Sequence, residues 1–246
     1  MENLLITMNS FPLETNYEEI FSEVKAAGLK GVEIRRELLN EQTPNLREIK
    51  RMLTALNLKA YYSCPIALFG KEHQLIDLTT FYKEAIELGA ELIKFSLGDY
   101  KENISNIRAL GDAVNYFTEA GITFTIENDQ TALGGRIDRL VNFFSTCHGA
   151  RIPIFLTCDI GNWVYVGENP ETAIEMLRDE TIYIHIKEVI ETGKGLETIA
   201  IDDTLNQKWK RFLSLFSKTH TMAFEFPIKS KVECYIQFIQ EGVYVR

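Results

Sequence analysis

The chain has 246 residues, of which 46% are hydrophobic and 25% are charged, and its formal net charge is −9 at pH 7. This composition is typical of a globular protein, and the acidic balance argues against a nucleic-acid partner, because phosphate binding depends on Lys and Arg. No apolar run reaches the roughly 18–20 residues of a membrane span, and no N-terminal segment has the form of a signal peptide. The four cysteines form no CxxC pair, so we expect reduced thiols in a cytoplasmic protein and no cysteine-rich zinc site.

Strand and helix patterns alternate along the whole chain. Predicted strands begin near residues 4, 31, 58, 92, 122, 154, 182 and 222. The predicted helices cover about residues 16–27, 45–56, 75–88, 103–120, 136–147, a segment beginning at Asn169-Pro170, 206–216 and 231–240. Strand three is predicted to run from Leu58 to Ser63, where Pro65 closes it.

Eight strand–helix units of about 30 residues each are typical of a (β/α)8 TIM barrel, a parallel eight-stranded α/β fold. We therefore expect one TIM-barrel domain over residues 1–246. The alternative is an open doubly wound sheet, which would usually carry a glycine-rich phosphate turn after its first strand. Here that segment is Met8-Asn9-Ser10-Phe11-Pro12, which contains no glycine.

Four consecutive predicted strands, the fifth to the eighth, carry a residue of a metal-ligating type at or near their ends. These residues are Glu127, Asp159, His185 and Glu225. In a (β/α)8 barrel such positions meet at one side of the mouth. Carboxylates packed together raise each other's pKa, and a divalent cation removes that cost. Three oxygens and one imidazole nitrogen favour Mn²⁺, Mg²⁺ or Co²⁺, with Zn²⁺ as a further option.

Each of the four residues also has a purely structural interpretation. Glu127 could be solvated or cap a helix, Asp159 could cap the following turn, and His185 could be a hydrogen-bonded core residue. Glu225 lies between two phenylalanines, where burial without a partner would be costly. The combination on four neighbouring strands favours a functional site.

Further polar residues have the inward parity or lie beside the predicted ligands. The candidates for substrate contacts are Glu33, Arg35, Lys94, Asn162, Trp163 and Lys187. Positive groups beside a cation favour a substrate with its own carboxylate or phosphate. The alternatives are that Arg35 and Lys94 only pair with Glu33 or Glu127, and that Trp163 packs in the barrel rim instead of covering a sugar. The segment 188–205 could form a hairpin lid over the mouth, or a passive excursion.

Segments along the whole chain resemble the xylose-isomerase-like TIM barrels, a superfamily of sugar and sugar-phosphate isomerases and epimerases. They are Ile126-Glu-Asn-Asp-Gln130, Cys158-Asp-Ile-Gly-Asn-Trp163, Tyr183-Ile-His-Ile-Lys187 and Phe224-Glu-Phe-Pro227. A narrower resemblance is to the epimerases of 2-ketogluconate utilisation. It rests on Gly31-Val-Glu-Ile-Arg-Arg-Glu-Leu38, Lys94-Phe-Ser-Leu-Gly98, Glu127-Asn-Asp-Gln-Thr131, Gly134-Gly-Arg136 and Asp159-Ile-Gly-Asn-Trp163.

The resemblance implies a function for the predicted ligands. In ketose 3-epimerases of this superfamily a Glu-Asp-His-Glu set, matching Glu127, Asp159, His185 and Glu225, holds a divalent metal that is usually Mn²⁺. One glutamate removes a proton beside the substrate carbonyl, the metal stabilises the enediolate, and the other glutamate returns a proton on the opposite face. The resemblance thus implies a metal-dependent sugar epimerase or isomerase with Glu127 and Glu225 as catalytic residues. Barrels of this kind often form homodimers.

Two positions depart from the ketose 3-epimerase pattern. Asn162 stands where those enzymes usually have a histidine, and Lys187 lies where they place an arginine on the substrate. We therefore expect an acidic or phosphorylated keto-sugar rather than a free ketohexose. A dehydratase or an aldose–ketose isomerase on the same site stays open, as does a binding or regulatory protein. An apurinic endonuclease is disfavoured, because it needs many histidines at the mouth and the chain has only four.

Overall fold

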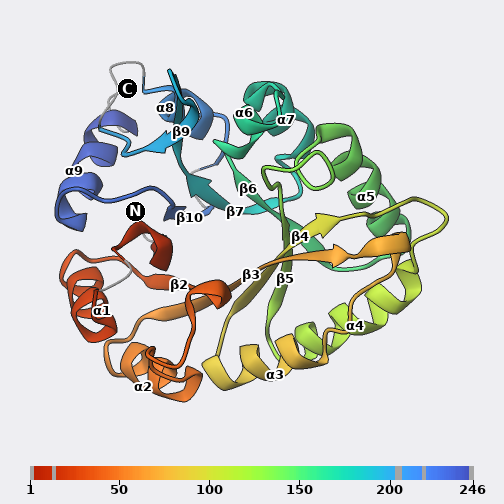
Figure 1. The fold of residues 1–246 in the computed structure, drawn as a ribbon, viewed down its shortest axis with the longest axis horizontal. Helices are drawn as coiled ribbons and strands as arrows, with labels where there is room; N and C mark the ends of the chain where they lie inside the picture. The colour runs from red at the N-terminus through yellow and green to blue at the C-terminus, as the bar shows by residue number, and fades with distance from the viewer. Residues whose placement is uncertain (1–2, 13–14, 203–206, 218–219, 244–246) are drawn as a thin grey trace.

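Eight parallel strands close into a barrel in the computed structural model, which describes residues 3–12, 15–202, 207–217 and 220–243 (Figure 1). The strands are β1 (Leu4–Thr7), β2 (Gly31–Arg35), β3 (Lys59–Phe69), β4 (Leu92–Gly98), β5 (Thr123–Glu127), β6 (Ile154–Asp159), β7 (Thr181–Ile186) and β10 (Thr221–Phe224). Strands that follow one another in sequence pair side by side, and β10 closes the ring on β1 through Leu4 and Met222. The prediction of a (β/α)8 barrel is confirmed.

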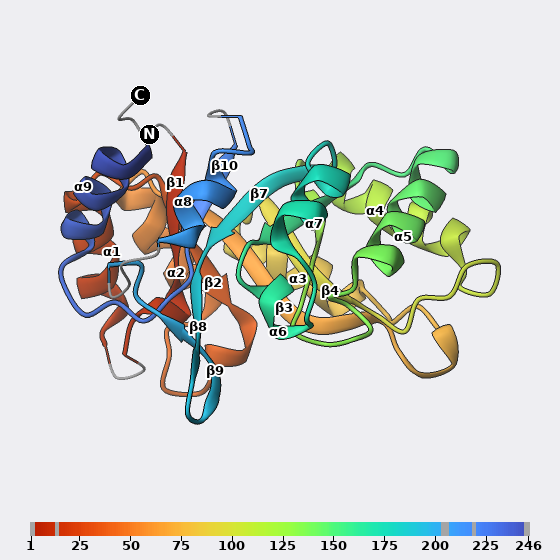
Figure 2. The ribbon, with the colours of Figure 1, turned by 90° about the horizontal axis from the view of Figure 1, so that it is seen from above.

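Helices surround the barrel on its outside (Figures 1 and 2). They are α1 (Tyr17–Ala26), α2 (Leu46–Ala55), α3 (Thr79–Leu88), α4 (Ile107–Glu119), α5 (Ile137–Gly149), α6 (Asn162–Tyr165), α7 (Pro170–Leu177), α8 (Lys208–Leu213) and α9 (Val232–Val243), with the 3₁₀ turns η1 (Met8–Ser10), η2 (Arg36–Leu38) and η3 (Lys71–His73). Asparagine side chains cap four of them, at Asn16, Asn45, Asn106 and Asn169, by accepting first-turn backbone N–H groups. No helix within the described residues is long and apolar enough to cross a membrane.

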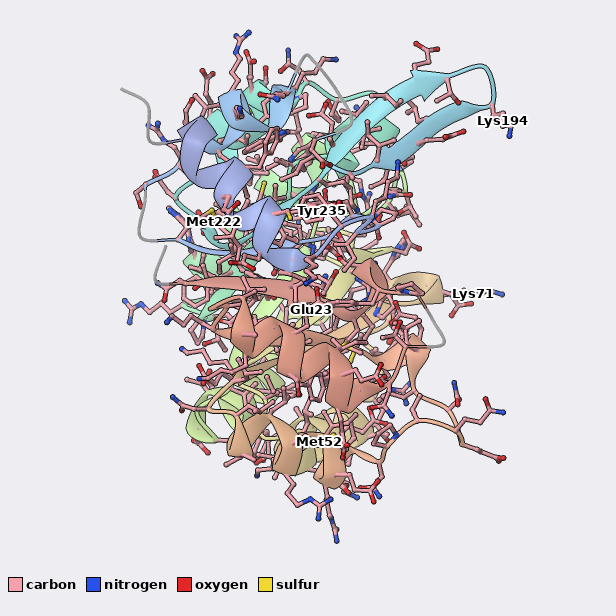
Figure 3. All side chains as sticks on the ribbon, turned by 90° about the vertical axis from the view of Figure 1, so that its left-hand side faces the viewer. Glu23, Met52, Lys71, Lys194, Met222 and Tyr235 are labelled. Atoms are coloured by element: carbon pink, nitrogen blue, oxygen red, sulfur yellow. The ribbon has the colours of Figure 1, made fainter. Side chains whose placement is uncertain are left out.

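The first and last units of the barrel meet on the side that faces the viewer in Figure 3. The backbone N–H of Val232, at the start of α9, donates to Glu23 Oε1 of α1 at 3.1 Å. Near the same place the backbone N–H of Lys229 donates to the Tyr235 hydroxyl at 2.9 Å. The first of these contacts joins the first and last units of the barrel, and the second holds the segment that leads into α9.

The barrel interior has an apolar floor and a polar upper part. The floor is a separate small cluster of Leu5, Tyr61, Leu92, Tyr183 and Ala223. Side chains two apart on a strand face the same side. Lys94, His185 and Glu225 each stand two positions after a residue of this floor, so they also point inward. On β7 the Tyr183 ring stands edge-on to the His185 ring, with 4.9 Å between ring centroids. The apolar floor therefore supports a polar site directly above it.

Two predicted boundaries are wrong in the third strand–helix unit, β3 and α3. Pro65 does not end β3, which continues to Phe69 across a register shift between Cys64 and Ala67; a bulge is a place where a strand tolerates proline. Helix α3 begins at Thr79 rather than Leu75, because Leu75 instead pairs with Phe69 in an isolated bridge.

Helix α4 begins at Ile107, after the Asn106 cap, because Asn103 has a left-handed backbone with φ of 63°. The helix predicted over residues 206–216 is α8, which is shorter, and its predicted first residue, Asn206, lies outside the described residues.

A β-hairpin follows β7 without an intervening helix. It consists of β8 (Glu188–Thr192) and β9 (Gly195–Ile199), and Gly195 takes a φ of 113° in the turn. The hairpin projects away from the helices, with Lys194 at its tip (Figures 2 and 3). The predicted hairpin is therefore present, and its action as a lid stays a prediction.

Candidate metal centre

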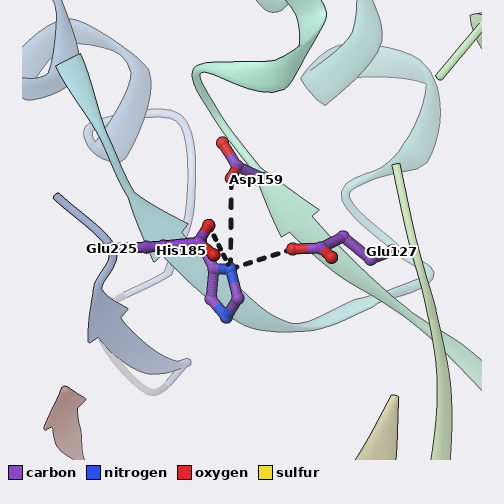
Figure 4. A group of neighbouring side chains, drawn as sticks. All are labelled: Glu127, Asp159, His185 and Glu225. Carbon is purple, nitrogen blue, oxygen red and sulfur yellow. Dashed lines mark hydrogen bonds and ion pairs between the residues drawn. The ribbon is translucent and has the colours of Figure 1, made fainter. Parts of the chain in front are cut away.

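The four predicted ligands meet inside the barrel, where the three carboxylates surround one ring nitrogen of the histidine (Figure 4). His185 Nδ1 lies 2.9 Å from Glu127 Oε1, 2.9 Å from Glu225 Oε2 and 4.0 Å from Asp159 Oδ2. All four residues are buried, and one ligand atom from each fits within a group no wider than 4.8 Å. This spacing is compact enough for a single ion to contact all four.

The strand register explains why these side chains converge. Glu127 and Asp159 are the last residues of β5 and β6, and Asp159 is the direct partner of His185 on β7. Glu225 follows the last residue of β10, and its backbone N–H donates to the Ile186 carbonyl at 3.1 Å. The four residues therefore lie near the ends of four neighbouring strands, where their side chains reach one point.

Asp159 serves the turn and the cluster with different oxygen atoms. Its Oδ1 accepts the backbone N–H groups of Gly161 at 2.8 Å and Asn162 at 3.0 Å. Its Oδ2 is left to face the cluster. The capping role considered from the sequence is present, and it fixes the carboxylate so that the second oxygen points at His185.

Asn128 locks the ends of β5 and β6 together, and sequence reasoning missed it. Its side-chain amide donates to the Asp159 carbonyl at 2.8 Å, and its Oδ1 accepts the Asp159 N–H at 2.8 Å. Its backbone carbonyl also accepts from Asn162 Nδ2 at 2.9 Å. The available signal was an amide side chain directly after Glu127, at the point where a strand ends.

Glu33 and Lys94 lie beneath the ligands as a buried second layer. Glu33 Oε2 is 2.8 Å from His185 Nε2, the ring nitrogen that faces away from the other carboxylates. Lys94 Nζ bridges Glu33 Oε1 at 3.0 Å and Glu127 Oε1 at 2.9 Å. Both side chains are almost completely buried. Lys94 thus pairs with Glu33 and Glu127, which is the alternative to substrate contact considered from the sequence.

Arg35 approaches Glu225 from β2. Its Nη1 lies 2.8 Å from Glu225 Oε1 and 3.6 Å from Glu33 Oε1, and its Nη2 lies 2.6 Å from the more exposed Glu37. Asn9 Nδ2 also donates to Glu225 Oε1, at 3.3 Å, a contact that sequence reasoning missed. One oxygen of Glu225 is therefore held by Arg35 and Asn9, and the other faces His185.

Lys187 and Asn162 lie on the opposite side of the cluster. Lys187 Nζ lies 2.6 Å from Asp159 Oδ2 and 2.9 Å from Glu225 Oε2, and it donates to Asn162 Oδ1 at 3.2 Å. Gln130, which is exposed, donates to the same Asn162 oxygen at 3.0 Å. Trp163 is fully buried in α6, and this placement favours packing in the barrel rim over contact with a sugar.

The surrounding charges decide which carboxylates are ionised. Burial would raise the pKa of Glu225, but Lys187 and His185 reverse this and hold it well below its ordinary value. Burial would also raise the pKa of Glu127, but Lys94 outweighs this effect and the pKa of Glu127 is lowered. Burial raises the pKa of Asp159 to about 7, although Lys187 opposes it. The ionised form of Asp159 is thus the one that most needs a further cation.

The histidine is held between carboxylates on both sides. Burial and Lys94 would lower the pKa of His185, but Glu33 and Glu225 raise it well above its ordinary value. With a carboxylate at each ring nitrogen, the imidazole carries a proton on both. A metal ion at Nδ1 would replace one of these protons, while Glu33 would continue to accept the other.

The donor set fits a hard divalent cation. Asp159 Oδ2 and Glu33 Oε1 are buried, and the nearest cationic group to each is a lysine ammonium, at 2.6 Å and 3.0 Å. Four buried carboxylates face Arg35, Lys94 and Lys187 together with the protonated imidazole, and a metal ion at Nδ1 would take over the charge of that imidazole. Oxygen-rich sets with one imidazole suit Mn²⁺, Mg²⁺ or Co²⁺.

Comparison with known proteins supports the fold. No protein-family profile matches the chain, and no curated protein matches its sequence. Among solved structures, a xylose isomerase domain containing protein from Salmonella typhimurium LT2 matches with a TM-score of 0.70 and 13% identity, over 98% of this chain and 94% of that one. An L-ribulose 3-epimerase matches with a TM-score of 0.67 and 16% identity, over 98% and 86%.

A probable 3-DHS dehydratase involved in petrobactin synthesis, from Bacillus anthracis, matches with a TM-score of 0.71 and 9% identity, over 97% of this chain and 98% of that one. The solved structures that resemble this chain thus include xylose isomerase-like TIM barrels. At these identities the likeness establishes the fold, and the chemistry has to be argued from the site.

Proposed function

We propose that the protein is a divalent-metal-dependent epimerase or isomerase of an acidic or phosphorylated keto-sugar. The observation that carries the proposal is the convergence of Glu127, Asp159, His185 and Glu225 around His185 Nδ1. When bound, a divalent ion would polarise the substrate carbonyl and stabilise the negative charge that follows proton removal. We propose Mn²⁺ as the ion.

The proton transfers fall to Glu127 and Glu225. Both lie 2.9 Å from His185 Nδ1, and they come from strands β5 and β10, which two further strands separate in the barrel. Both have a lowered pKa and are therefore ionised at neutral pH. Inversion needs a carboxylate that removes a proton on one face and a protonated group that delivers a proton to the other face. One ionised glutamate supplies the base, and the other takes up a proton from solvent before it delivers one, so two glutamates reaching in from different strands can divide that task.

The remaining polar groups support an anionic substrate. With a divalent ion present and His185 neutral, the four buried carboxylates would be outweighed by the ion and by Arg35, Lys94 and Lys187. A buried excess of positive charge favours a bound anion. Lys187, Arg35 and Asn162 border the cluster, and we propose them as substrate contacts. The sequence resemblance adds sugars of the 2-ketogluconate kind as the first class to test.

Three structural neighbours bear on the alternatives. L-ribulose 3-epimerase and D-allulose 3-epimerase are named for epimerisation, and a further neighbour is named as a dehydratase. Dehydration and aldose–ketose isomerisation would begin from the same proton removal beside a carbonyl. The epimerase assignment is preferred because two glutamates, rather than one, face the centre of the cluster and can act as base and proton donor on opposite faces.

Hydrogen exchange in D₂O tests the proposal directly. The Mn²⁺-loaded protein is incubated with 2-ketogluconate, its phosphate and neutral ketoses, and NMR follows deuterium at the carbon beside the carbonyl. We expect deuterium incorporation with a second epimer, and loss of both after EDTA treatment. Deuterium with loss of water would instead establish a dehydratase, and absence of exchange across acidic and neutral sugars would contradict the proposal.

The two glutamates provide the mutational test. We expect Glu225→Gln and Glu127→Gln each to lower epimerisation by about a hundredfold or more, because each removes one acid–base group. Glu91→Gln is the matched control, since Glu91 is an exposed residue whose partner is Lys59, at 2.9 Å. Unchanged turnover in either site variant would remove that glutamate from the proton-transfer step.

A further inference from the structure

The ammonium group of Lys187 occupies oxygens that the candidate metal centre would also use. Its Nζ lies 2.6 Å from Asp159 Oδ2 and 2.9 Å from Glu225 Oε2. Glu225 Oε2 is the atom that lies 2.9 Å from His185 Nδ1. An ion bound by Asp159, His185 and Glu225 would need the same two oxygens, and a cation placed there would repel the ammonium group.

Lys94 also contacts the cluster, but it is held differently. Its Nζ is fixed between Glu33 and Glu127, and its side chain is 2% exposed. Glu33 is not among the four ligands, so Lys94 keeps a carboxylate partner when Glu127 turns to a metal. Lys94 is therefore a permanent part of the buried layer.

Lys187 has a way out of the cluster. It lies between the end of β7 and the start of β8, with its side chain 8% exposed. Its stem passes over Gly161, where an added Cβ would lie only 2.8 Å from Lys187 Cγ. Its third partner, the Asn162 oxygen, is shared with the exposed Gln130. The ammonium group can therefore shift toward Asn162 and Gln130 and still have hydrogen-bond acceptors within reach.

We propose that Lys187 and the divalent ion compete for Asp159 and Glu225. In the metal-free protein the ammonium group lies between the two carboxylates and reduces the repulsion between their negative charges. Metal binding displaces it toward Asn162 and Gln130, where it pairs with the anionic group of the substrate. The competition rests on the geometry of the site alone, whereas the pairing with substrate rests on the proposed function.

This arrangement couples the binding of the metal to that of an anionic substrate. Before the metal enters, Lys187 is engaged with carboxylates and cannot serve an anion well. After metal entry it is left as a cation without its two carboxylate partners, which is costly in a buried site unless an anion replaces them. Metal and anionic substrate therefore favour each other's binding, by linkage.

Mn²⁺ binding to Lys187→Met tests the competition without any substrate. Free Mn²⁺ is measured by electron paramagnetic resonance during titration of metal-free protein. We expect the variant to bind Mn²⁺ about tenfold more tightly than the wild type, because the competing charge is gone. Lys187→Arg keeps the charge and should stay near the wild-type affinity. Lys59→Met removes an exposed ammonium group 2.9 Å from Glu91 and is the matched control.

Thermal unfolding gives a second readout. Metal-free Lys187→Met should melt below the wild type, because two buried carboxylates lose their partner, and saturating Mn²⁺ should raise its melting temperature by more than it raises that of the wild type. If Lys187→Met is too unstable to purify, Lys187→Gln serves for the same comparison. Unchanged or weaker Mn²⁺ binding in these variants, with a wild type that does bind, would overturn the competition and leave the proposed function standing.

The remaining outcomes separate the two proposals. A wild type and variants that bind no divalent ion would overturn both the competition and the metal-dependent function. For the substrate half, Lys187→Met should raise KM for acidic sugars about tenfold more than it raises KM for neutral ketoses. An equal rise for both classes would overturn the pairing of Lys187 with the substrate anion.

Discussion

Glu33 illustrates what a single residue's pattern can and cannot predict. Its inward direction follows from the two-residue period of a strand, but its depth does not, since Glu33 and Arg35 share the same parity. In the structure Glu33 lies under His185 Nε2, whereas Arg35 reaches Glu225 near the mouth. Depth depends on the register between strands, here Glu33 opposite Thr7 and Tyr61, which no local pattern contains.

The contact between Glu33 and His185 predicts a role in metal binding. We expect His185→Ala to abolish high-affinity Mn²⁺ binding and Glu33→Gln to weaken it by about tenfold, because the amide still accepts a hydrogen bond but no longer carries charge beside the ring. Calorimetric titration with Mn²⁺ measures both. Full metal occupancy in His185→Ala would remove the histidine from the ligand set, and an unchanged affinity in Glu33→Gln would limit Glu33 to structural support.

At the scale of elements, the sequence patterns predicted eight strands and the residues at four of their ends, and they failed where tertiary contacts override local signals. Pro65 lies inside β3 because the register shift between Cys64 and Ala67 places it where the strand pairing needs no N–H donor. Trp163 is buried because the turn held by Asp159 leads directly into α6. Asn128, Asn9 and Gln130 were missed because their partners belong to other elements.

The close approach of the ends of β3 and β4 gives a prediction about stability. Gly98 has a φ of 72°, and an added Cβ would overlap the Phe69 carbonyl oxygen and the Ala67 side chain. We expect Gly98→Ala to lower the free energy of unfolding by about 3 kcal/mol. Gly121→Ala is the matched control, because Gly121 has a φ of 77° with no atom within 4 Å of the added Cβ, so it should lose only about 1 kcal/mol.

Urea unfolding measures both glycine variants. The difference between them reports the packing of β4 against β3, since the backbone strain is common to both. Equal losses would show that the strand ends separate easily enough to admit a methyl group.

Closure of the barrel places the site at one end of a single ring of strands, with the first and last described helices joined at α1 and α9. Each strand that carries a candidate ligand thereby holds its neighbour in position, and the apolar floor packs beneath the cluster. That residues 1–246 form one domain, and that the protein pairs as a homodimer, stay predictions. The sequence could predict the ring from the repeat of its units, because the length of each unit leaves few other parallel arrangements.

Cysteine reactivity reports on the closed barrel as a whole. Cys64, Cys147 and Cys158 are buried, whereas Cys234 is exposed. Burial raises the pKa of Cys147 and of Cys158 to about 12 and also raises that of Cys64. Because the thiolate is the reactive form, we expect a disulfide reagent at pH 8 to modify one thiol in the native protein and all four in denaturant. Cys234→Ser should leave the native protein unreactive.

The same three thiols make stability depend on pH in a defined direction. In the unfolded chain a thiol ionises near about 8.5, whereas the buried thiols stay protonated to a higher pH. The native state then holds more protons than the unfolded state, so the stabilisation is complete below about pH 8.5 and is lost as pH rises toward about 12. Urea unfolding of the wild type at increasing alkaline pH should show this loss, and it should be smaller in Cys147→Ala. For the reactivity prediction, modification of several thiols in the native protein at pH 8 would be the contrary result, and it would mean that the helices separate readily from the strands.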